Sequence, residues 1–280
     1  MPRQSSPVRW RALLYALNAG LPLPALILLA KAHPLALCFF AFTLAMHGLL
    51  LWGIMHPRST WLGPLTHSFQ PEGKELWLTL DDGPDGERTR ELSNQLRQRG
   101  VRATFFVIGE RLRAQPEVAR LLLEDGHTLA NHTQRHPRKS FWCSNASRVR
   151  AEVDQGAAEL RAIGVESKWF RPPVGHKPPA LRKALADRGM KLITWSVGGR
   201  DGWSADVDKV VLRVLAKARP GAILVLHEAR AYSIPTILAV VDALLARGFE
   251  FTIPTEDMRS RAIRGATCAV TTFTAPQVTS

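Results

Sequence analysis

The sequence predicts an α/β fold built on parallel strands, and three observations support this prediction. Helical stretches alternate with short apolar runs that are rich in β-branched and aromatic residues. The helical stretches end in glycine, where a helix terminus needs a residue of left-handed conformation. Seven apolar runs with helices between them are typical of βα units and indicate a barrel-like closure of the sheet. The terminal glycines are Gly100, Gly126, Gly164, Gly189 and Gly248.

Two uncharged apolar runs come first in the chain, at residues 12–30 and 34–55. Each is close to the length of about 20 residues that a bilayer-spanning helix needs. We expect two transmembrane helices that form a hairpin, with residues 31–33 as its turn. The alternative is a signal peptide followed by a buried core helix. It is disfavoured because the combined apolar stretch far exceeds a signal-peptide core of about 7–15 residues.

Flanking charges set the expected orientation of this hairpin. Arg3, Arg9 and Arg11 precede the first run, and Arg58 follows the second. By the positive-inside rule both ends lie in the cytoplasm, and the following domain faces it as well. If only one run spans, the domain moves to the other side. We therefore expect a multi-pass protein of a bacterial inner membrane with its domain facing the cytoplasm.

The remaining elements follow in chain order and divide the chain into four segments. These are a membrane anchor at 1–55, a Pro- and Gly-rich linker at 56–73, an α/β domain at 74–258 and a disordered tail at 259–280, which is rich in Thr, Ala and Ser. Strands are expected near 76–80, 102–108, 127–130, 168–171, 191–197, 222–227 and 249–253. Helices are expected near 87–99, 116–124, 146–163, 178–188, 206–218 and 235–246.

Charge and cysteine content narrow the class of protein. The net charge is +13, but the Lys and Arg residues are scattered along the expected helices without a basic run. Beside a membrane anchor, this favours attraction to anionic lipid headgroups and disfavours nucleic-acid binding. Cys38, Cys143 and Cys268 form neither a CxxC pair nor an even disulfide framework, which favours a reducing compartment.

Ionisable residues lie at or soon after the ends of five of the expected strands. Because sites in parallel α/β folds lie at the carboxyl ends of strands, we expect these residues to meet at one rim. In chain order they are Asp81 and Asp82, His132 and His136, Arg171, Asp201, and His227.

The histidine pair and a nearby carboxylate indicate a catalytic metal site. His132 and His136 are four residues apart, so one helical turn would place both imidazoles on one face. Asp82 adds a carboxylate, and two histidines with one carboxylate leave coordination positions open. Two adjacent carboxylates would repel each other if both had the same function. We therefore expect one of Asp81 and Asp82 to bind metal and the other to act as base. Arg171 can pair with a carboxylate, and His227 can act as a general acid.

With these residues, the domain resembles a known family, the NodB-type polysaccharide deacetylases of carbohydrate esterase family 4. The resemblance covers roughly residues 74–254. LTLDDGP at 78–84 is similar to the first motif, TFDDGP, and HTQRH at 132–136 to the second, H(S/T)xxH. RPPV at 171–174 is similar to the third, RxPY, and LVLH at 224–227 to the fifth, LxLH.

The resemblance implies a distorted (β/α) barrel of about seven parallel strands with one divalent metal ion, zinc before cobalt, manganese or nickel. Asp82, His132 and His136 look like the metal ligands. By position, Asp81 looks like the catalytic base, and Arg171 looks like the arginine that holds it. His227 looks like the general acid, and Asp201 like the residue that orients it. The backbone N–H of Val174 looks like the oxyanion donor, and substrate contacts are implied at Pro173, Trp203 and Leu226.

Three departures from the family pattern concern the edges of this site. Val174 replaces the usual aromatic residue, although a backbone donor survives that change. The fourth motif is usually DxxDW, whereas GGRDGW at 198–203 lacks the first aspartate and inserts a glycine before Trp203. Asp201 and Trp203 therefore belong to a motif that departs from the family pattern. Glu228 replaces the common aspartate after the last histidine.

The resemblance implies a hydrolase of amide bonds other than peptide bonds, which removes N-acyl groups, chiefly acetyl, from an amino sugar by attack of metal-bound water. The substrate is a polysaccharide or a lipid-linked glycan, and the anchor favours the latter because a tethered domain meets lipid-linked sugars at the bilayer. One alternative is a carbohydrate O-acetyl esterase with the same site. Another is a non-catalytic, membrane-bound carbohydrate-binding protein, which the intact DDGP and HxxxH disfavour.

Overall fold

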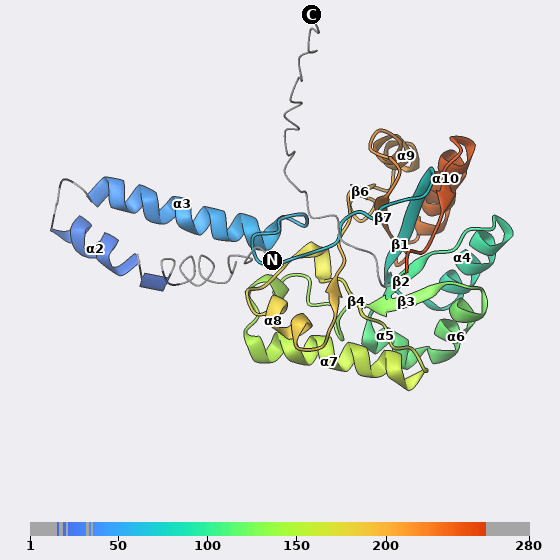
Figure 1. Cartoon of the computed structure of the whole chain (residues 1–280), viewed down its shortest axis with the longest axis horizontal. Helices are drawn as coiled ribbons and strands as arrows, with labels where there is room; N and C mark the ends of the chain where they lie inside the picture. The colour runs from blue at the N-terminus through green and yellow to red at the C-terminus, as the bar shows by residue number, and fades with distance from the viewer. Residues whose placement is uncertain (1–15, 17–18, 21, 32–33, 35, 256–280) are drawn as a thin grey trace, which may run out of the picture.

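The computed structural model describes residues 16, 19–20, 22–31, 34 and 36–255 of the chain. A curled parallel sheet is surrounded by helices, and two further helices extend from one side of this domain (Figure 1). The predicted α/β class and barrel-like closure are confirmed. The predicted tail at 259–280 lies outside the described residues.

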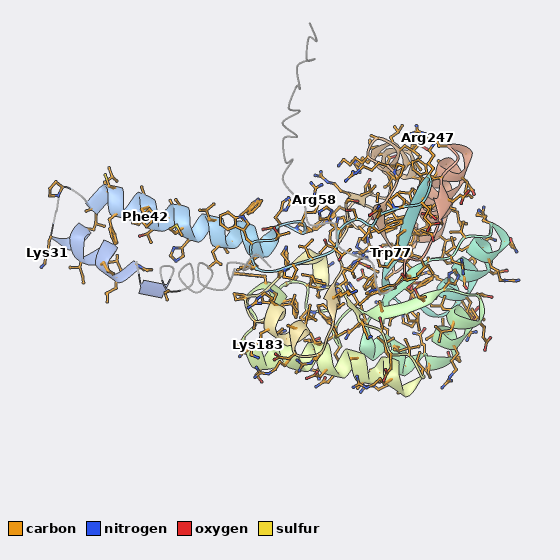
Figure 2. All side chains as sticks on the ribbon, viewed as in Figure 1. Lys31, Phe42, Arg58, Trp77, Lys183 and Arg247 are labelled. Carbon is orange, nitrogen blue, oxygen red and sulfur yellow. The ribbon has the colours of Figure 1, made fainter. Side chains whose placement is uncertain are left out.

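The helices α2 (Pro22–Ala30) and α3 (Ala36–Met55) lie side by side (Figure 1). Among the described residues α3 alone is long and apolar enough to cross a membrane. Large apolar side chains such as Phe42 are exposed along α3, outside the domain (Figure 2). The second predicted span therefore has a matching helix. In the first run, residues 16, 19–20 and the nine residues of α2 are helical, and the other parts of that run and parts of its turn lie outside the described residues.

Eight strands of the described part of the chain form the sheet, and each of their pairings is parallel. The order is β5-β4-β3-β2-β1-β7-β6, with β8 paired to the start of β1. The strands are β1 Glu75–Gly83, β2 Thr104–Val107, β3 Thr128–Asn131, β4 Trp169–Phe170, β5 Lys191–Leu192, β6 Val197–Gly198, β7 Ala222–His227 and β8 Glu250–Phe251.

The closure of the sheet depends on a short crossing between its two edges. β5 and β6 lie at opposite edges, although only residues 193–196 separate them in sequence. Four residues span at most about 14 Å, so the two edges lie close together. The single strand predicted at 191–197 is therefore wrong. β5 pairs with β4 and β6 with β7, whereas Ile193 between them bridges to Thr66, because the chain has to leave one edge to reach the other.

Helices pack around the sheet, and all six predicted in the domain are present (Figure 1). The predicted helices at 178–188 and 206–218 are shorter than expected. A further helix follows β2 directly and has only six residues, too few for a periodic pattern to predict it. The helices are α4 Gly86–Gln98, α5 Gly109–Ala114, α6 Pro116–Glu124, α7 Ala146–Ala162, α8 Leu181–Ala186, α9 Val207–Leu215 and α10 Ser233–Ala246.

Side chains alternate along β1 between two apolar layers, as the period of a strand requires. Leu78 belongs to the main core, which also contains residues of α4 and α10. Trp77 points to the opposite face and packs with Phe106 and Trp169. Asp81 has the same parity as Trp77 and Thr79. The alternation therefore directs this carboxylate to the inner face of the curled sheet.

The segment 56–73, predicted as a linker, contains no helix, and it lies against the domain. The Thr66 N–H donates to the Leu192 carbonyl over 2.8 Å, and the Phe69 N–H donates to the Gly221 carbonyl over 2.8 Å. Leu62 in the same segment is buried. These contacts hold the segment between α3 and β1 in a defined path along the domain.

Candidate active site

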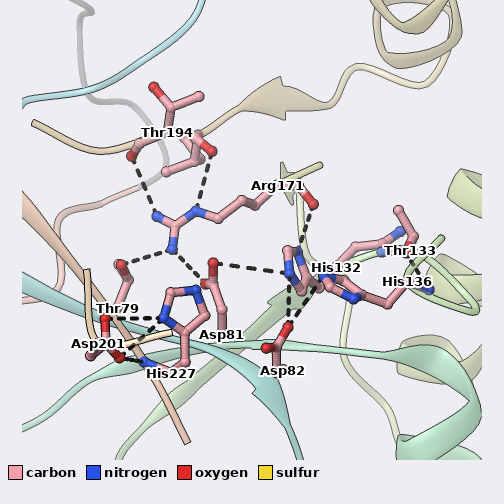
Figure 3. Close-up of polar contacts among 12 residues, drawn as sticks. Thr79, Asp81, Asp82, His132, Thr133, His136, Arg171, Thr194, Asp201 and His227 are labelled. Carbon is pink, nitrogen blue, oxygen red and sulfur yellow. Dashed lines mark hydrogen bonds and ion pairs between the residues drawn. The ribbon is translucent and has the colours of Figure 1, made fainter. Parts of the chain in front are cut away.

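The carboxyl ends of the strands bring the predicted polar residues together (Figure 3). Asp81 is the β-sheet partner of His227 on the neighbouring strand β7. Asn131 ends β3, and His132 follows it directly. The strand-end rim expected from the sequence is therefore present.

Three side chains form a compact group, which we call the ligand cluster: Asp82, His132 and His136. Their possible ligand atoms all lie within 4.8 Å of one another. Oδ1 of Asp82 lies 3.5 Å from Nε2 of His132 and 3.2 Å from Nε2 of His136. This oxygen is buried and has no hydrogen-bond partner among the described residues. A buried, unsatisfied carboxylate oxygen facing two imidazole nitrogens fits a divalent cation.

The protonation of the cluster suits metal binding as well. Nδ1 of the buried His132 lies 2.8 Å from the Arg171 carbonyl, which can only accept, so Nδ1 carries the proton and Nε2 keeps its lone pair. Burial and the neighbouring His132 lower the pKa of His136 to about 4, so its ring is neutral. Burial alone would raise the pKa of Asp82, but His132, His136 and His227 hold it well below its usual value. Two imidazole nitrogens and one carboxylate suit zinc and its transition-metal neighbours.

A loop, and not the predicted helical turn, brings the two histidines together. Thr133 and His136 have φ angles of 72° and 52°, in the left-handed region. Oδ1 of Asn131 accepts the Thr133 N–H over 2.9 Å, and the Thr133 hydroxyl accepts the His136 N–H over 3.0 Å. Gly156 of α7 packs so closely that a methyl group there would lie 2.5 Å from Oδ1 of Asn131. Side-chain hydrogen bonds to the backbone therefore shape this loop.

Asp81 faces Arg171, away from the ligand cluster's centre. Nη1 of Arg171 donates to Oδ1 of Asp81 over 2.6 Å and to the Thr79 hydroxyl over 2.8 Å. Nη2 donates to the Thr194 carbonyl over 3.3 Å, and the guanidinium stacks on the ring of Phe106 at 4.0 Å. Arg171 is fully buried, so this pair is a charged contact inside the barrel. The two adjacent carboxylates thus diverge, as expected.

His227 is held by Asp201, which belongs to the altered fourth motif. Both oxygens of Asp201 lie close to Nδ1 of His227, at 3.2 and 3.1 Å, and Oδ2 also accepts the His227 N–H over 2.7 Å. The Tyr232 hydroxyl donates to the Asp201 carbonyl over 3.0 Å. Burial alone would lower the pKa of His227, but Asp201, with Asp81 and Asp82, raises it to about 9. The imidazole is therefore protonated near neutral pH.

The four predicted oxyanion and substrate residues differ in their positions. Val174 lines the site pocket and has a φ of 49°, which a β-branched residue rarely adopts. Trp203 is 90% exposed at the pocket mouth. Pro173 is buried beside Val174, where its ring restricts the backbone. The predicted substrate contact at Leu226 is wrong. Its side chain is fully buried in the main core, because side chains alternate along β7 and Leu226 points away from His227.

The geometry can be compared with known proteins. The chain matches the family model described as Polysaccharide deacetylase over residues 69–193. It is 34% identical over 193 residues to a chitooligosaccharide deacetylase of Bradyrhizobium sp. (strain ANU 289), covering 63% of this chain and 87% of that protein. It is 30% identical over 204 residues to a peptidoglycan-N-acetylglucosamine deacetylase of Bacillus cereus, covering 70% and 94%. The chain belongs to the polysaccharide deacetylase family.

A solved structure agrees with this membership. A family 4 carbohydrate esterase from Streptomyces lividans, in complex with acetate, superposes with a TM-score of 0.60 at 28% identity. The match covers 66% of this deacetylase and 95% of that chain. The resemblance to the NodB-type deacetylases is confirmed, and the protein is a carbohydrate deacetylase by family.

Two side chains near the site of this deacetylase were not assigned a role from the sequence. Arg111 donates to the Asp82 carbonyl over 2.9 Å and so holds the backbone of a ligand. Glu228 is buried, bonds to the Thr89 hydroxyl at 2.6 Å and lies tightly against Gly83. Burial raises the pKa of Glu228 to about 8, so this carboxyl is largely protonated at neutral pH. In the sequence, only their positions indicate a place near the site: Glu228 directly follows His227, and Arg111 follows β2.

Proposed function

We propose that this deacetylase removes the N-acetyl group from an amino sugar of a glycan, with a divalent cation held by the ligand cluster. One observation carries the proposal. The cluster shares a pocket of about 220 Å³ with Asp81 and His227, each of which is held by a partner of opposite charge. The named relatives act on chitooligosaccharide and on peptidoglycan N-acetylglucosamine, which supports this substrate class.

Asp81 is the proposed base. When bound, a divalent cation lowers the pKa of a water molecule and polarises a carbonyl group. Oδ2 of Asp81 lies 3.9 Å from Nε2 of His132, beside the cluster, whereas Oδ1 is held by Arg171. The free oxygen is positioned to accept a proton from the water that attacks the amide carbon. Arg171 compensates the negative charge of this carboxylate and fixes its orientation.

His227 and Val174 complete the proposed reaction from the other side of the pocket. The protonated imidazole of His227 donates its proton to the nitrogen of the departing amino sugar. Asp201 holds Nδ1, which leaves Nε2 as the donating atom. The backbone contacts of the described residues give the Val174 N–H no acceptor, so it can donate to the oxyanion.

The proposal includes a membrane anchor. Exposed apolar side chains along the 20 residues of α3 support a bilayer-spanning segment. The arginines that flank the two apolar runs support a hairpin with the catalytic domain in the cytoplasm of a bacterium. A domain tethered in this way can reach glycans at the bilayer, so a lipid-linked glycan is included among the proposed substrates.

The test measures acetate release by the purified full chain from chitooligosaccharide, a peptidoglycan fragment and an N-acetylglucosamine-bearing lipid. We expect release that requires added zinc, is lost with a chelator, and falls at least about a hundredfold in Asp81→Asn. Asp187→Asn, an exposed carboxylate paired with Lys183, is the matched control and should behave like the wild type. Zinc-independent release, or unchanged release from Asp81→Asn, would refute the proposal. A parallel O-acetylated sugar separates amide from ester hydrolysis.

A further inference from the structure

A second pocket opens directly beside the reaction pocket. Its volume is about 300 Å³. Val174, Trp195, Gly202, Trp203 and His227 line both spaces, so the two are continuous. A substrate whose acetamido group lies at the ligand cluster can therefore extend its neighbouring group into this second pocket.

One wall of the second pocket consists of residues 56–58, which follow α3 without a break. The end of α3 is fixed to the domain by Lys177. Its backbone N–H donates to the Ile54 carbonyl over 2.9 Å, and its ammonium group donates to the His56 carbonyl. Lys177 is buried, and burial lowers its pKa to about 8. If α3 spans a bilayer, this pocket therefore lies at the level of the lipid headgroups.

Besides His227, which pairs with the pocket's one carboxylate, Asp201, the second pocket is lined by three cations. The cations are Arg58, Arg200 and Lys217. Their side chains form no hydrogen bond or ion pair with any residue that the structure describes. The one carboxylate, Asp201, already holds His227 with both oxygens. Gly198, which also lines the pocket, stands where the fourth family motif has an aspartate.

We propose that this pocket binds the phosphate that joins the amino sugar to a membrane lipid. The inference rests on the proposed deacetylase function and specifies its substrate as a phospholipid-linked amino sugar. Guanidinium groups bind phosphate oxygens in pairs of hydrogen bonds, and three uncompensated cations favour a group with one or two negative charges. A neutral sugar chain has no group that needs them.

The position of the pocket distinguishes a lipid from a soluble source of phosphate. A nucleotide-linked sugar would present the same phosphate chemistry from solution. The phosphate of a lipid-linked sugar, however, is held at the membrane surface, where residues 56–58 lie. Arg58 stands three residues past the end of α3, so it can reach this phosphate while the lipid chain stays in the bilayer.

The test compares three probes on the full chain in detergent with zinc. The first is N-acetylglucosamine joined through a phosphate to a ten-carbon isoprenoid. The second is the uncharged decyl glycoside of the same sugar, and the third is UDP-N-acetylglucosamine. We expect kcat/KM for the first probe to exceed both others by about tenfold or more. Arg58→Ala and Arg200→Ala should reduce this preference about tenfold through KM, whereas Arg58→Lys retains most of it.

Direct binding gives a second measurement that does not depend on turnover. Titration calorimetry should detect binding of the ten-carbon isoprenyl phosphate to the wild type and about tenfold weaker binding to Arg58→Glu. Arg120→Ala, an exposed arginine on α6, is the matched control and should leave both measurements unchanged.

The outcomes separate this inference from the proposed function. Equal turnover of the phosphorylated and uncharged lipid probes, or an equal loss on both in Arg58→Ala, would overturn the phosphate site. Equal preference for UDP-N-acetylglucosamine would overturn the lipid source. If no probe is deacetylated but isoprenyl phosphate binds and Arg58→Glu weakens it, the phosphate site stands and the deacetylase proposal fails. If isoprenyl phosphate does not bind, the phosphate site fails whatever the turnover.

Discussion

Two adjacent carboxylates reach one pocket yet face different partners. In a regular strand, neighbouring side chains point to opposite faces. Here the register of β1 shifts between Asp81 and Gly83, and Asp82 has a φ of 76°. The irregular end of the strand thus lets Asp81 face Arg171 while Asp82 turns to the histidines. This backbone distortion at a site of proposed chemistry fits the tendency of strain to gather at functional sites.

Replacing Arg171 tests the buried ion pair. Arg171→Met leaves the buried Asp81 carboxylate without its cation, so we expect a loss of about 3–5 kcal/mol in the free energy of unfolding. Adding Asp81→Asn to this variant removes the stranded charge and should recover part of that loss. Urea denaturation of both variants measures the difference. Arg150→Met on the exposed side of α7 is the control, and a similar loss there would show that the method does not resolve the pair.

The raised pKa of His227 predicts the alkaline side of the pH profile. The protonated imidazole is the active form, so kcat/KM should fall as pH rises through this pKa of about 9. Asp201 is the group that raises it by direct contact, and a bound cation would act in the opposite direction. Asp201→Asn should therefore move the alkaline limb to lower pH by about one unit or more. An unchanged limb in Asp201→Asn would show that another group controls it.

The sequence predicted which residues gather at the site better than it predicted how they are held. Ligand and acid–base candidates follow strands, and that position is visible in sequence. The contact of Arg111 with the Asp82 carbonyl and the burial of Glu228 depend on the distance between elements, which no local pattern reports. Leu226 was misassigned because the sequence resemblance gives no information on which face of β7 a residue occupies.

At the scale of elements, the loop after β3 determines the spacing of the two histidine ligands. An HxxxH pair is compatible with a helix, and the sequence alone offered that interpretation. Asn131 instead holds the Thr133 N–H, and left-handed residues turn the chain. α7 holds this loop as well, since the Asn131 amide also donates to the Val153 carbonyl of α7 over 2.9 Å.

A methyl group added to α7 should therefore weaken metal binding. Gly156→Ala would place its Cβ 2.5 Å from Oδ1 of Asn131, so the amide that shapes the loop has to move. We expect at least about tenfold weaker zinc affinity in competition with a chelator, with little change in helix content. Gln155→Ala, on the exposed side of the same helix, is the control. Unchanged zinc affinity in Gly156→Ala would show that the loop does not depend on this contact.

The strands at the edges of the sheet show where local patterns stop being informative. The apolar run at 191–197 has the composition of one strand, and its division into β5 and β6 follows from sheet closure. Closure of the sheet depends on all strands together, so it cannot be predicted from a window of seven residues. The long strands β1 and β7, which are buried on both faces, were predicted well because their apolar content is continuous.

At the scale of the whole molecule, the segment that connects α3 to the domain also forms part of the domain's structure. Residues 56–73 add two bridges to the sheet and one wall of the pocket beside the site. The sequence indicated an anchor and a domain, but their contact depends on Lys177, which lies more than a hundred residues away from α3. The end of α3 therefore lies near the candidate active site, because residues 56–58 line the pocket beside it.

The proposed orientation predicts which side of the membrane exposes Cys143. This thiol lies on the exposed surface of the domain, and the chain has only two other cysteines, Cys38 in α3 and Cys268. In a Cys38→Ser, Cys268→Ser variant, a membrane-impermeant maleimide should label Cys143 in spheroplasts only after the inner membrane is permeabilised. The reason is the positive-inside rule, by which the flanking arginines favour a cytoplasmic location for both ends of the proposed hairpin. A variant that also carries Cys143→Ser is the control for background. Labelling of intact spheroplasts would place the domain outside and leave α3 as the single span.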